Sequence, residues 1–284
     1  MRNFLIITNP YKDENLQLTK QIIAYVQGRG GKASYLVSKI RRQGRGDFDV
    51  QAVPAETQCI LVLGGDGTLI RAATEAEALQ IPLIGVNLGT LGYLCELTEE
   101  TVFEAIDRLM REEYILEERM LLTGYKGSDR SEARVALNDI VIHREGPLSI
   151  ISLLVYVNGK LLNTYHADGM IVATPTGSTG YSMSAGGPIV DPKTNLILIT
   201  PINAHNLNSK SIILGAEDVV EIEIGSRRAE QDESACVSFD GDEVAHIKVG
   251  ERFVISRSQN HTQICKLNDR SFLELLGKKM QTYH

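Results

Sequence analysis

The pattern of hydrophobic and polar positions changes about 112 residues into the chain. Before that point, apolar runs such as FLIIT (4–8) and CILVL (59–63) alternate with stretches of helical spacing, as in Leu18, Ile22 and Val26. The runs predict buried strands, and the spaced residues predict amphipathic helices. Strands and helices in alternation predict a parallel sheet with helices on both faces, which is a doubly wound α/β domain.

The remaining elements of this first domain follow the same pattern. Strands are expected at ASYLV (33–37) and IPLIGVN (81–87), and a helix at 69–79. Another helix is expected after Thr98, whose hydroxyl can cap it. The apolar stripe of that helix comprises Val102, Ala105, Ile106 and Leu109.

The second part of the chain is rich in β patterns. Val220, Ile222 and Ile224 alternate with glutamates, which predicts a half-buried strand, and Asn158-Gly159 is typical of a tight hairpin turn. A helical pattern returns in SFLELLGKKM (271–280). We therefore expect an α/β domain over 1–112, a mainly antiparallel β domain over 113–261, and a C-terminal helical segment, about 262–284, that returns to the first domain.

Composition narrows the class of protein. The 284 residues suffice for two domains with hydrophobic cores, and a net charge of -7 argues against non-specific nucleic-acid binding. The chain shows neither a signal-peptide core nor the roughly 20 apolar residues of a membrane span. We expect a cytoplasmic protein with neither nucleic acid nor membrane as a partner.

The cysteines and histidines show no metal-binding spacing. There is no CxxC pair, so we expect reduced, packed thiols and no zinc knuckle. The cysteines are Cys59, Cys95, Cys236 and Cys265, and the histidines without ligand spacing are His143, His205, His246, His261 and His284.

The glycine-rich turn GGDGT, Gly64 to Thr68, is the first candidate for chemistry. It follows a predicted strand and opens a helix, where free N–H groups attract anions and glycines let the backbone approach a phosphate. It matches neither GxGxxG nor GxxxxGK[ST]. An acid among phosphate-facing amides makes sense if a divalent cation intervenes or if Asp66 accepts a proton from an attacking hydroxyl, and both indicate phosphoryl transfer.

Two alternatives stay open at this turn. GGDGT can be a tight βα turn without a ligand. Arg71, one turn into the helix, is placed either to meet a phosphate or to stand exposed.

A basic segment, KIRRQGRG (39–46), also allows two interpretations. It is either a solvated loop or a loop that meets a polyanionic ligand.

A second unusual segment runs from His166 to Pro192. It places several threonines and serines around four glycines and a tyrosine, and so offers many hydroxyl and N–H groups without charge. Such a lining suits a ribose or a nucleobase with phosphate nearby, although an ordinary Ser/Gly loop is the alternative.

Taken together, these motifs resemble those of the NAD kinase family. They are GGDGT (64–68), GVNLGTLGYL (85–94), LND (137–139) and HADGMIVATPTGSTGYSMSAGGPI (166–189). Lipid kinases share GGDGT and phosphofructokinases carry a close relative, whereas the long Thr/Ser/Gly segment is highly specific. The resemblance covers essentially the whole chain.

The resemblance implies an activity and an architecture. A phosphoryl group passes from ATP or polyphosphate, with Mg2+ or another divalent cation, to the 2′-hydroxyl of the adenosine ribose of NAD, giving NADP. The implied fold is an α/β domain followed by a β-sandwich domain with the site between them, in a homo-oligomer, either a dimer or a tetramer.

The resemblance also implies roles for individual residues. Asp66 is the base or metal-organising acid, with Gly67 in contact with the ligand beside it. Asn138 and Asp139 bind NAD, and Asp168 binds its nicotinamide end. The adenosine half is wrapped by Thr179, Gly180, Tyr181, Ser182, Met183 and Ser184.

This chain departs from the common family pattern at several positions. Asp139 stands where Glu is frequent, Gly180 where Ala is frequent, and Tyr93 where Phe is frequent. His166 is a candidate contact at a position where members vary. Asp240-Gly241 is expected to be a hairpin turn.

Two other functions fit part of the sequence. A lipid kinase of the diacylglycerol type would share GGDGT, but the Thr/Ser/Gly segment and the lack of a basic amphipathic segment argue against it. A non-catalytic NADP(H)-binding regulator would have no need for Asp66 among phosphate-facing amides.

Overall fold

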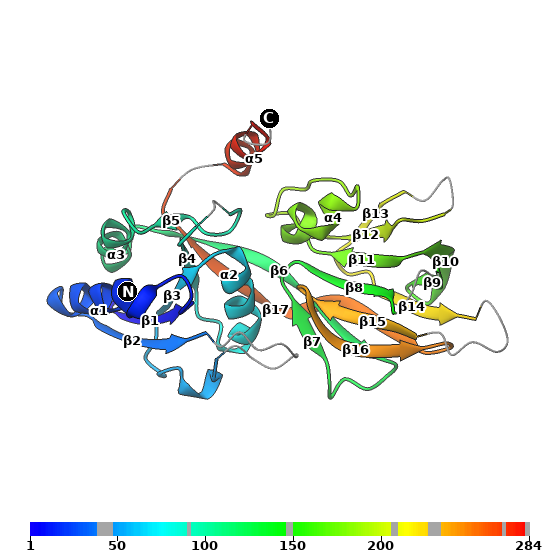
Figure 1. Cartoon of the computed structure of the whole chain (residues 1–284), viewed down its shortest axis with the longest axis horizontal. Coiled ribbons are helices and arrows are strands. Elements are labelled where there is room, and N and C mark those ends of the chain that lie inside the picture. The colour runs from blue at the N-terminus through cyan, green and yellow to red at the C-terminus, as the bar shows by residue number, and fades with distance from the viewer. Residues whose placement is uncertain are drawn as a thin grey trace. The chain divides into compact units, whose positions relative to one another are not determined.

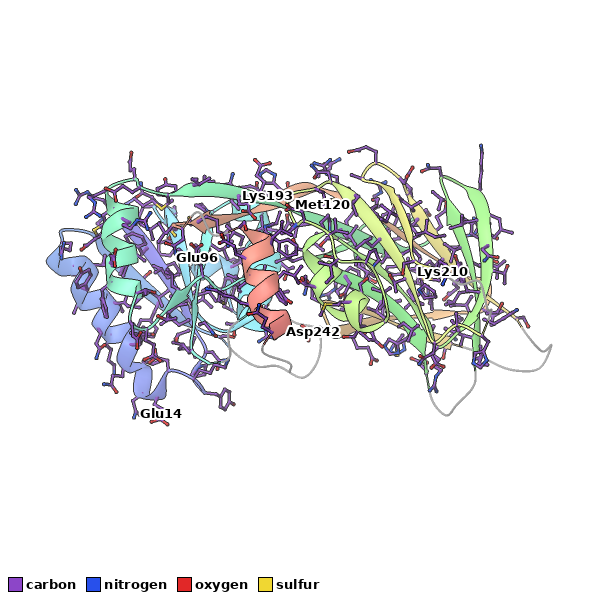
Figure 2. All side chains as sticks on the ribbon, turned by 90° about the horizontal axis from the view of Figure 1, so that it is seen from above. Glu14, Glu96, Met120, Lys193, Lys210 and Asp242 are labelled. Atoms are coloured by element: carbon purple, nitrogen blue, oxygen red, sulfur yellow. The ribbon has the colours of Figure 1, made fainter. Side chains whose placement is uncertain are left out.

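The computed structural model describes residues 1–38, 48–89, 92–145, 150–205, 210–226, 234–268 and 271–281 (Figure 1). The chain divides into two compact units, Met1–Arg119 with His261–His284, and Met120–Asn260. Side chains fill the interior of each unit, and each has a hydrophobic core of its own (Figure 2). The basic segment 39–46, expected as a solvated loop or a contact for a polyanion, lies outside the described residues.

A parallel sheet forms the centre of the first unit. Its strands follow the order β2–β1–β3–β4, and β5 and the C-terminal end of β17 also pair with β4. Because these strands run the same way, the loops that follow β1, β3 and β4 meet at one edge of the sheet. The strands are β1 (Asn3–Thr8), β2 (Lys32–Val37), β3 (Cys59–Gly64), β4 (Leu83–Asn87), β5 (Leu97–Thr98) and β17 (Arg252–Lys266).

Helices cover both faces of this sheet. Ile22 of α1 and Ile106 of α3 are buried in one core with Leu61 of the sheet. Alternate strand residues such as Val62 are buried on the opposite face, where α2 packs against β3 and β4. The helices are α1 (Gln17–Gly28), α2 (Asp66–Glu75), α3 (Val102–Met110) and α5 (Phe272–Gln281), with short 3-10 turns η1 (Glu14–Leu16), η2 (Val50–Ala52) and η3 (Glu77–Leu79).

The second unit is an antiparallel β-sandwich. One sheet has the order β13–β12–β11–β8–β15–β16, and the other the order β10–β9–β14–β17. Val172 and Val237 of the first sheet meet Leu153 and Ile222 of the second in one core. The strands are β6 (Ile115–Lys126), β7 (Arg134–Ala136), β8 (Asp139–Arg144), β9 (Ile151–Val157), β10 (Lys160–Ala167), β11 (Gly169–Ala173), β12 (Leu196–Ile202), β13 (Ile212–Gly215), β14 (Val220–Gly225), β15 (Ser234–Phe239) and β16 (Asp242–Lys248).

The fold class predicted from the sequence is confirmed. An α/β unit is followed by a mainly antiparallel sandwich, and the C-terminal helix α5 belongs to the first unit. The hairpin at Asn158-Gly159 is present, and both residues have the positive φ that such a turn requires, 50° and 73°. None of the described helices has the length and apolar character needed to cross a membrane.

Two details of the helix prediction were wrong. The helix expected at 69–79 begins at Asp66, because the N–H groups of Thr68 and Leu69 already bond the carbonyl of Gly65, and it ends at Glu75 before a separate 3-10 turn. Thr98 does not cap α3, which starts at Val102 after Thr101. The two threonines instead close a turn, in which the N–H of Thr98 donates to Thr101 Oγ1 over 3.0 Å.

Candidate active site

The GGDGT turn joins β3 to α2 in the first unit. Gly64 ends the strand, Gly65 precedes the helix, and Asp66 is its first residue. A Cβ on Gly64 would lie 2.5 Å from Oγ1 of Thr68, so the first glycine is required by the close approach of the helix. Gly67 is exposed, and Nη1 of Arg71 stands 3.8 Å from where a Cβ on Gly67 would be. The Arg71 guanidinium therefore folds back over the turn.

The Asp66 carboxylate holds the segment that follows Gly92. Its Oδ2 accepts a hydrogen bond from the backbone N–H of Tyr93 over 2.5 Å. Its Oδ1 accepts from the N–H groups of Leu94 and Cys95 over 3.2 and 3.1 Å. A Cβ on Gly92 would overlap this carboxylate. Asp66 is thus a fixed group that binds three consecutive backbone amides.

Two lysines lie near this turn. Nζ of Lys12 is 3.1 Å from where a Cβ on Gly65 would stand and 3.3 Å from the same point on Gly89. Nζ of Lys279, in α5, lies 3.7 Å from the centre of the Tyr93 ring. Burial lowers the pKa of Lys279, while the charge of Asp66 opposes that shift. Lys12 thus places positive charge over the glycine backbone.

Lys12 was not among the site residues predicted from the sequence. It lies in the loop after β1, far from GGDGT in sequence, but β1 and β3 are parallel neighbours with Thr8 opposite Leu63. The buried Asp13 fixes that loop, since its carboxylate accepts from the N–H groups of Leu18 and Thr19 over 2.9 and 3.0 Å. A basic residue in the loop that follows the first strand was the pattern that could have revealed it.

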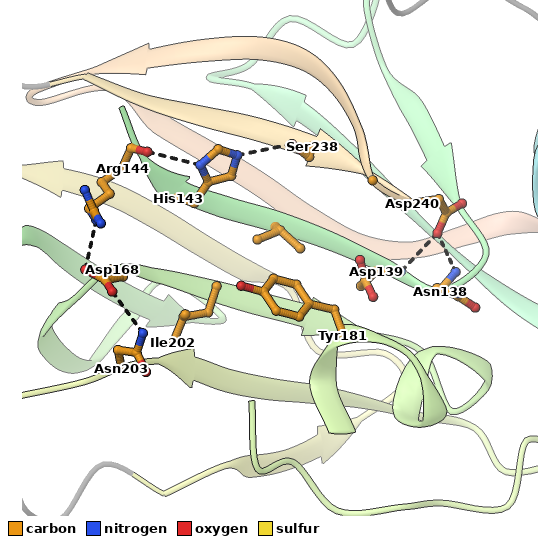
Figure 3. A pocket seen from close by; sticks show the side chains of 12 residues that line it. Asn138, Asp139, His143, Arg144, Asp168, Tyr181, Ile202, Asn203, Ser238 and Asp240 are labelled. Atoms are coloured by element: carbon orange, nitrogen blue, oxygen red, sulfur yellow. Dashed lines mark hydrogen bonds and ion pairs between the residues drawn. The ribbon is translucent and has the colours of Figure 1, made fainter. Parts of the chain in front are cut away.

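The second unit contains a cavity of about 730 Å³ at one face of the six-stranded sheet (Figure 3). Four of the residues expected from the sequence meet there: Asn138, Asp139, Asp168 and Tyr181. The rest of the lining was not singled out in advance, apart from the turn Asp240-Gly241, and comprises Val141, His143, Arg144, Ile202, Asn203, Ser238, Asp240 and Gly241.

Asp240 organises one end of this cavity. It lies with Gly241 in the turn between β15 and β16, and both have positive φ, 49° and 90°, as the expected hairpin requires. Its carboxylate accepts from the N–H groups of Leu137, Asn138 and Asp139 over 2.8, 2.7 and 3.1 Å. Burial raises the pKa of Asp240 to about 6, although these three hydrogen bonds oppose the shift. Asp240 thereby fixes the turn that presents Asn138 and Asp139.

Asp139 is buried beside it. Burial, and then the charge of Asp240, raise the pKa of Asp139 to about 7, while a hydrogen bond from the backbone N–H of Tyr181 opposes that shift. Near neutral pH this carboxyl is therefore present in both forms. The protonated form can donate a hydrogen bond to a ligand and the ionised form can only accept one.

The other end of the cavity carries a charged pair. Nε of Arg144 lies 2.9 Å from Oδ1 of Asp168, and the amide of Asn203 donates to Oδ2 over 3.0 Å (Figure 3). The hydrogen bond from Asn203, together with Arg144, lowers the pKa of Asp168. Asp168 thus stays ionised, and its orientation is fixed by two partners.

The Thr/Ser/Gly segment packs against the Asn138 turn. A Cβ on Gly177 would overlap the carbonyl oxygen of Asn138, and a Cβ on Gly180 would stand 3.5 Å from the Asn138 amide and 3.6 Å from Oδ2 of Asp139. The segment forms β11, a 3-10 turn η4 (Thr176–Thr179) and a short helix α4 (Tyr181–Ser184). Its glycines therefore bring backbone close to the cavity.

The other side chains of this segment that were expected to contact the ligand do not line the cavity. Ser182 is buried, with its hydroxyl 3.1 Å from that of Thr200, and Oγ1 of Thr179 donates to the carbonyl of Thr176. These two hydroxyls are engaged within the protein. Met183 and Ser184 are exposed and do not line the cavity, nor does His166 of β10, whose Nδ1 is buried without a hydrogen-bond partner among the described residues.

Comparison with known protein families identifies the family to which this chain belongs. The model of the ATP-NAD kinase N-terminal domain matches residues 4–114, and that of the C-terminal domain matches 137–267. An NAD kinase of Agathobacter rectalis is 63% identical over 284 residues, 100% of both chains. The chain belongs to the NAD kinase family. A second NAD kinase, from Lachnospira eligens, is 41% identical over 99% of this chain and 100% of its own.

Solved NAD kinase structures share the fold. Yeast NADH kinase complexed with NADH superimposes with a TM-score of 0.84 at 24% identity, over 98% of this chain and 88% of its own. An NAD kinase from Archaeoglobus fulgidus in complex with ATP gives 0.76 at 23% identity, over 97% and 98%. The matches to both NAD kinase domains and to full-length NAD kinases favour an NAD kinase over a lipid kinase or a non-catalytic regulator.

Proposed function

We propose that this NAD kinase family member transfers the terminal phosphoryl group of ATP to the 2′-hydroxyl of the adenosine ribose of NAD, giving NADP. The observation that carries the proposal is the environment of Asp66. An ionised carboxylate has about four acceptor positions, and the N–H groups of residues 93–95 occupy three. The Cys95 thiol is a further, weak donor to this carboxylate. A substrate hydroxyl would replace that thiol when Asp66 acts as its base.

The phosphate chain of ATP is assigned to the backbone of the glycine turn. Lys12 over Gly65 and Gly89, and Arg71 over Gly67, supply positive charge there. Mg2+ usually binds through one or two carboxylates together with substrate phosphates, so one acid at the turn fits a cation that arrives with ATP. When bound, the cation would neutralise charge on the phosphates during transfer.

NAD is assigned to the cavity of the second unit. Its volume of about 730 Å³ lies within the usual range for ligand sites, roughly 300–1,000 Å³. Asn138 and Asp139 supply amide and carboxyl groups for a ribose or base, and Tyr181 adds an aromatic surface that is 48% exposed. Asp168 is assigned to the nicotinamide end. Ser182 supports the segment from within, because its hydroxyl is bonded to Thr200.

Two broader properties are part of the proposal. The four cysteines are free and buried, which supports the expected cytoplasmic location. Assembly into a homo-oligomer, which the family resemblance implies, is also part of the proposal.

The direct test is an assay of the purified full-length chain. With NAD, ATP and magnesium, we expect NADP to accumulate, measured by a coupled NADP-dependent dehydrogenase. Product with polyphosphate but not with ATP would overturn the choice of donor. Absence of NADP with either donor would overturn the activity itself.

Lys12→Ala is expected to raise the KM for ATP about 10- to 100-fold, the equivalent of one charge-assisted hydrogen bond to a phosphate. The KM for NAD should change little. Initial rates over a range of ATP concentrations measure the effect, and Lys12→Arg should retain most of the affinity. Lys20→Ala, whose ammonium bonds the Asn15 carbonyl instead, is the matched control. An unchanged KM for ATP in Lys12→Ala would contradict the role.

A further inference from the structure

Four potential metal ligands meet at the end of β8 and the hairpin β15–β16. They are Glu145, just after β8, Cys236 on β15, and Glu243 and His246 on β16. One ligand atom from each lies within 4.8 Å of those of the other three. None of the four lines the cavity assigned to NAD. The proposed phosphoryl transfer therefore does not account for this cluster.

The register of the strands explains why three of these side chains, those of Glu145, Cys236 and His246, meet. Cys236 lies opposite His246 on one side and opposite His143 on the other. Glu145 is two residues beyond His143, so its side chain emerges from the same face. The neighbours of Cys236 along β15, Ala235 and Val237, point into the sandwich core. The cluster thus lies on the outer face of the sheet.

The distances are close to those of a metal site. Sγ of Cys236 lies 3.8 Å from Nδ1 of His246 and 2.8 Å from Oε1 of Glu145, and the His246 ring also bonds Glu145 through Nδ1. Zinc bonds of about 2.0–2.3 Å in a tetrahedron hold ligand atoms roughly 3–4 Å apart. The sulfur–nitrogen distance already fits. The sulfur–oxygen distance is that of a hydrogen bond and would widen when a metal replaces the proton.

We propose that Glu145, Cys236, Glu243 and His246 form a binding site for Zn2+. A thiolate and an imidazole favour zinc over Mg2+ or Ca2+, which take oxygen ligands. On binding, the Cys236 thiol loses its proton to solvent and the sulfur–zinc bond forms. The hydroxyl of Ser234 donates to Oε2 of Glu145, and this second bond orients the carboxylate.

The surroundings of Cys236 do not suit a reactive thiol. A cysteine that acts as a nucleophile or redox sensor has a lowered pKa and an electropositive, accessible environment. Cys236 is 5% exposed, and its sulfur faces the negatively charged carboxylate of Glu145. A bound zinc would tie the end of β8 to the edge hairpin. The start of β8 carries Asp139, so the site would stiffen a strand that reaches the cavity.

Zinc binding by the metal-free, full-length protein tests the proposal. After dialysis against a chelator, we expect isothermal titration to show one zinc per chain. Co2+ in its place should give the near-ultraviolet charge-transfer band of a cobalt–thiolate bond. His246→Gln and Glu243→Gln change side chains that are 58% and 55% exposed, so folding should be kept. His246→Gln should weaken zinc binding about 100-fold, and Cys236→Ser should abolish the cobalt band.

The control is His261→Gln. His261 lies 3.5 Å from a carboxylate oxygen of Glu118 and so forms a histidine–glutamate pair outside the cluster, and the variant should bind zinc like the parent. The proposal is overturned if the parent binds no zinc, or if both His246→Gln and Cys236→Ser bind it with parent affinity. These outcomes are independent of NADP formation, which is measured separately.

Discussion

Asp66→Asn is expected to lower the kcat for NADP formation by roughly two to four orders of magnitude, the usual contribution of a general base. Asparagine keeps the size of the side chain but cannot take a proton from the ribose hydroxyl. Its NH2 group also cannot accept from the backbone amides that the carboxylate now holds at Tyr93, Leu94 and Cys95. Steady-state rates with saturating NAD and ATP measure the loss, and calorimetric titration should show that NAD still binds.

Two further variants separate the chemistry from the fold. Gly92→Ala leaves Asp66 in place but pushes a methyl group into its carboxylate, so kcat should fall here too. Asp49→Asn alters another aspartate of the first unit, which accepts from the N–H of Gln51 in an exposed 3-10 turn, and it should leave kcat unchanged. An Asp66→Asn enzyme that turned over at the parent rate would remove Asp66 from the mechanism.

Asp240→Ala is expected to destabilise the second unit by about 2–4 kcal/mol. The truncation leaves the N–H groups of Leu137, Asn138 and Asp139 without their acceptor, and each unsatisfied buried donor costs roughly 1–3 kcal/mol. Relief of the burial of the Asp240 charge offsets part of that cost. Urea denaturation followed by circular dichroism measures the free energy of unfolding. NAD affinity should fall as well, because the Asn138 turn loses its anchor.

Asp218→Ala is the comparison for this effect. Asp218 also holds a turn of the second unit, through the N–H of Gly215 over 2.9 Å and the amide of Asn158 over 2.7 Å, but these bonds are exposed to solvent. Water can replace its oxygens, so the loss should stay below about 1 kcal/mol. Equal stability of the two variants would show that the amides held by Asp240 find other partners.

Much of the fold was predictable because it depends on local patterns. The helical spacing of Val102, Ala105, Ile106 and Leu109 and the alternation of Val220, Ile222 and Ile224 each mark one buried face, and both sets are buried as expected. The helix boundary at Thr98 was not predictable in the same way. Whether Thr98 or Thr101 precedes the first helical residue depends on a turn between two similar hydroxyls.

The candidate site was predictable only in part. Glycine-rich runs are visible in sequence, so GGDGT and the segment around Tyr181 could be singled out. Lys12 reaches Gly65 only because β1 and β3 are parallel neighbours. Asp240 reaches the Asn138 turn from about a hundred positions away, and Cys236 meets Glu145 over a similar separation. Such contacts depend on strand order and register, which local patterns do not determine.

The three amides on Asp66 have a consequence for the catalytic cycle. A protonated carboxyl has one acceptor position fewer than an ionised one. If Asp66 takes the ribose proton, as proposed, the three N–H groups use every position that remains. The acid then cannot accept a second hydroxyl until its proton has left. In the proposed mechanism, the loop after Gly92 therefore limits Asp66 to one proton at a time, and that proton must leave before the next NADP forms.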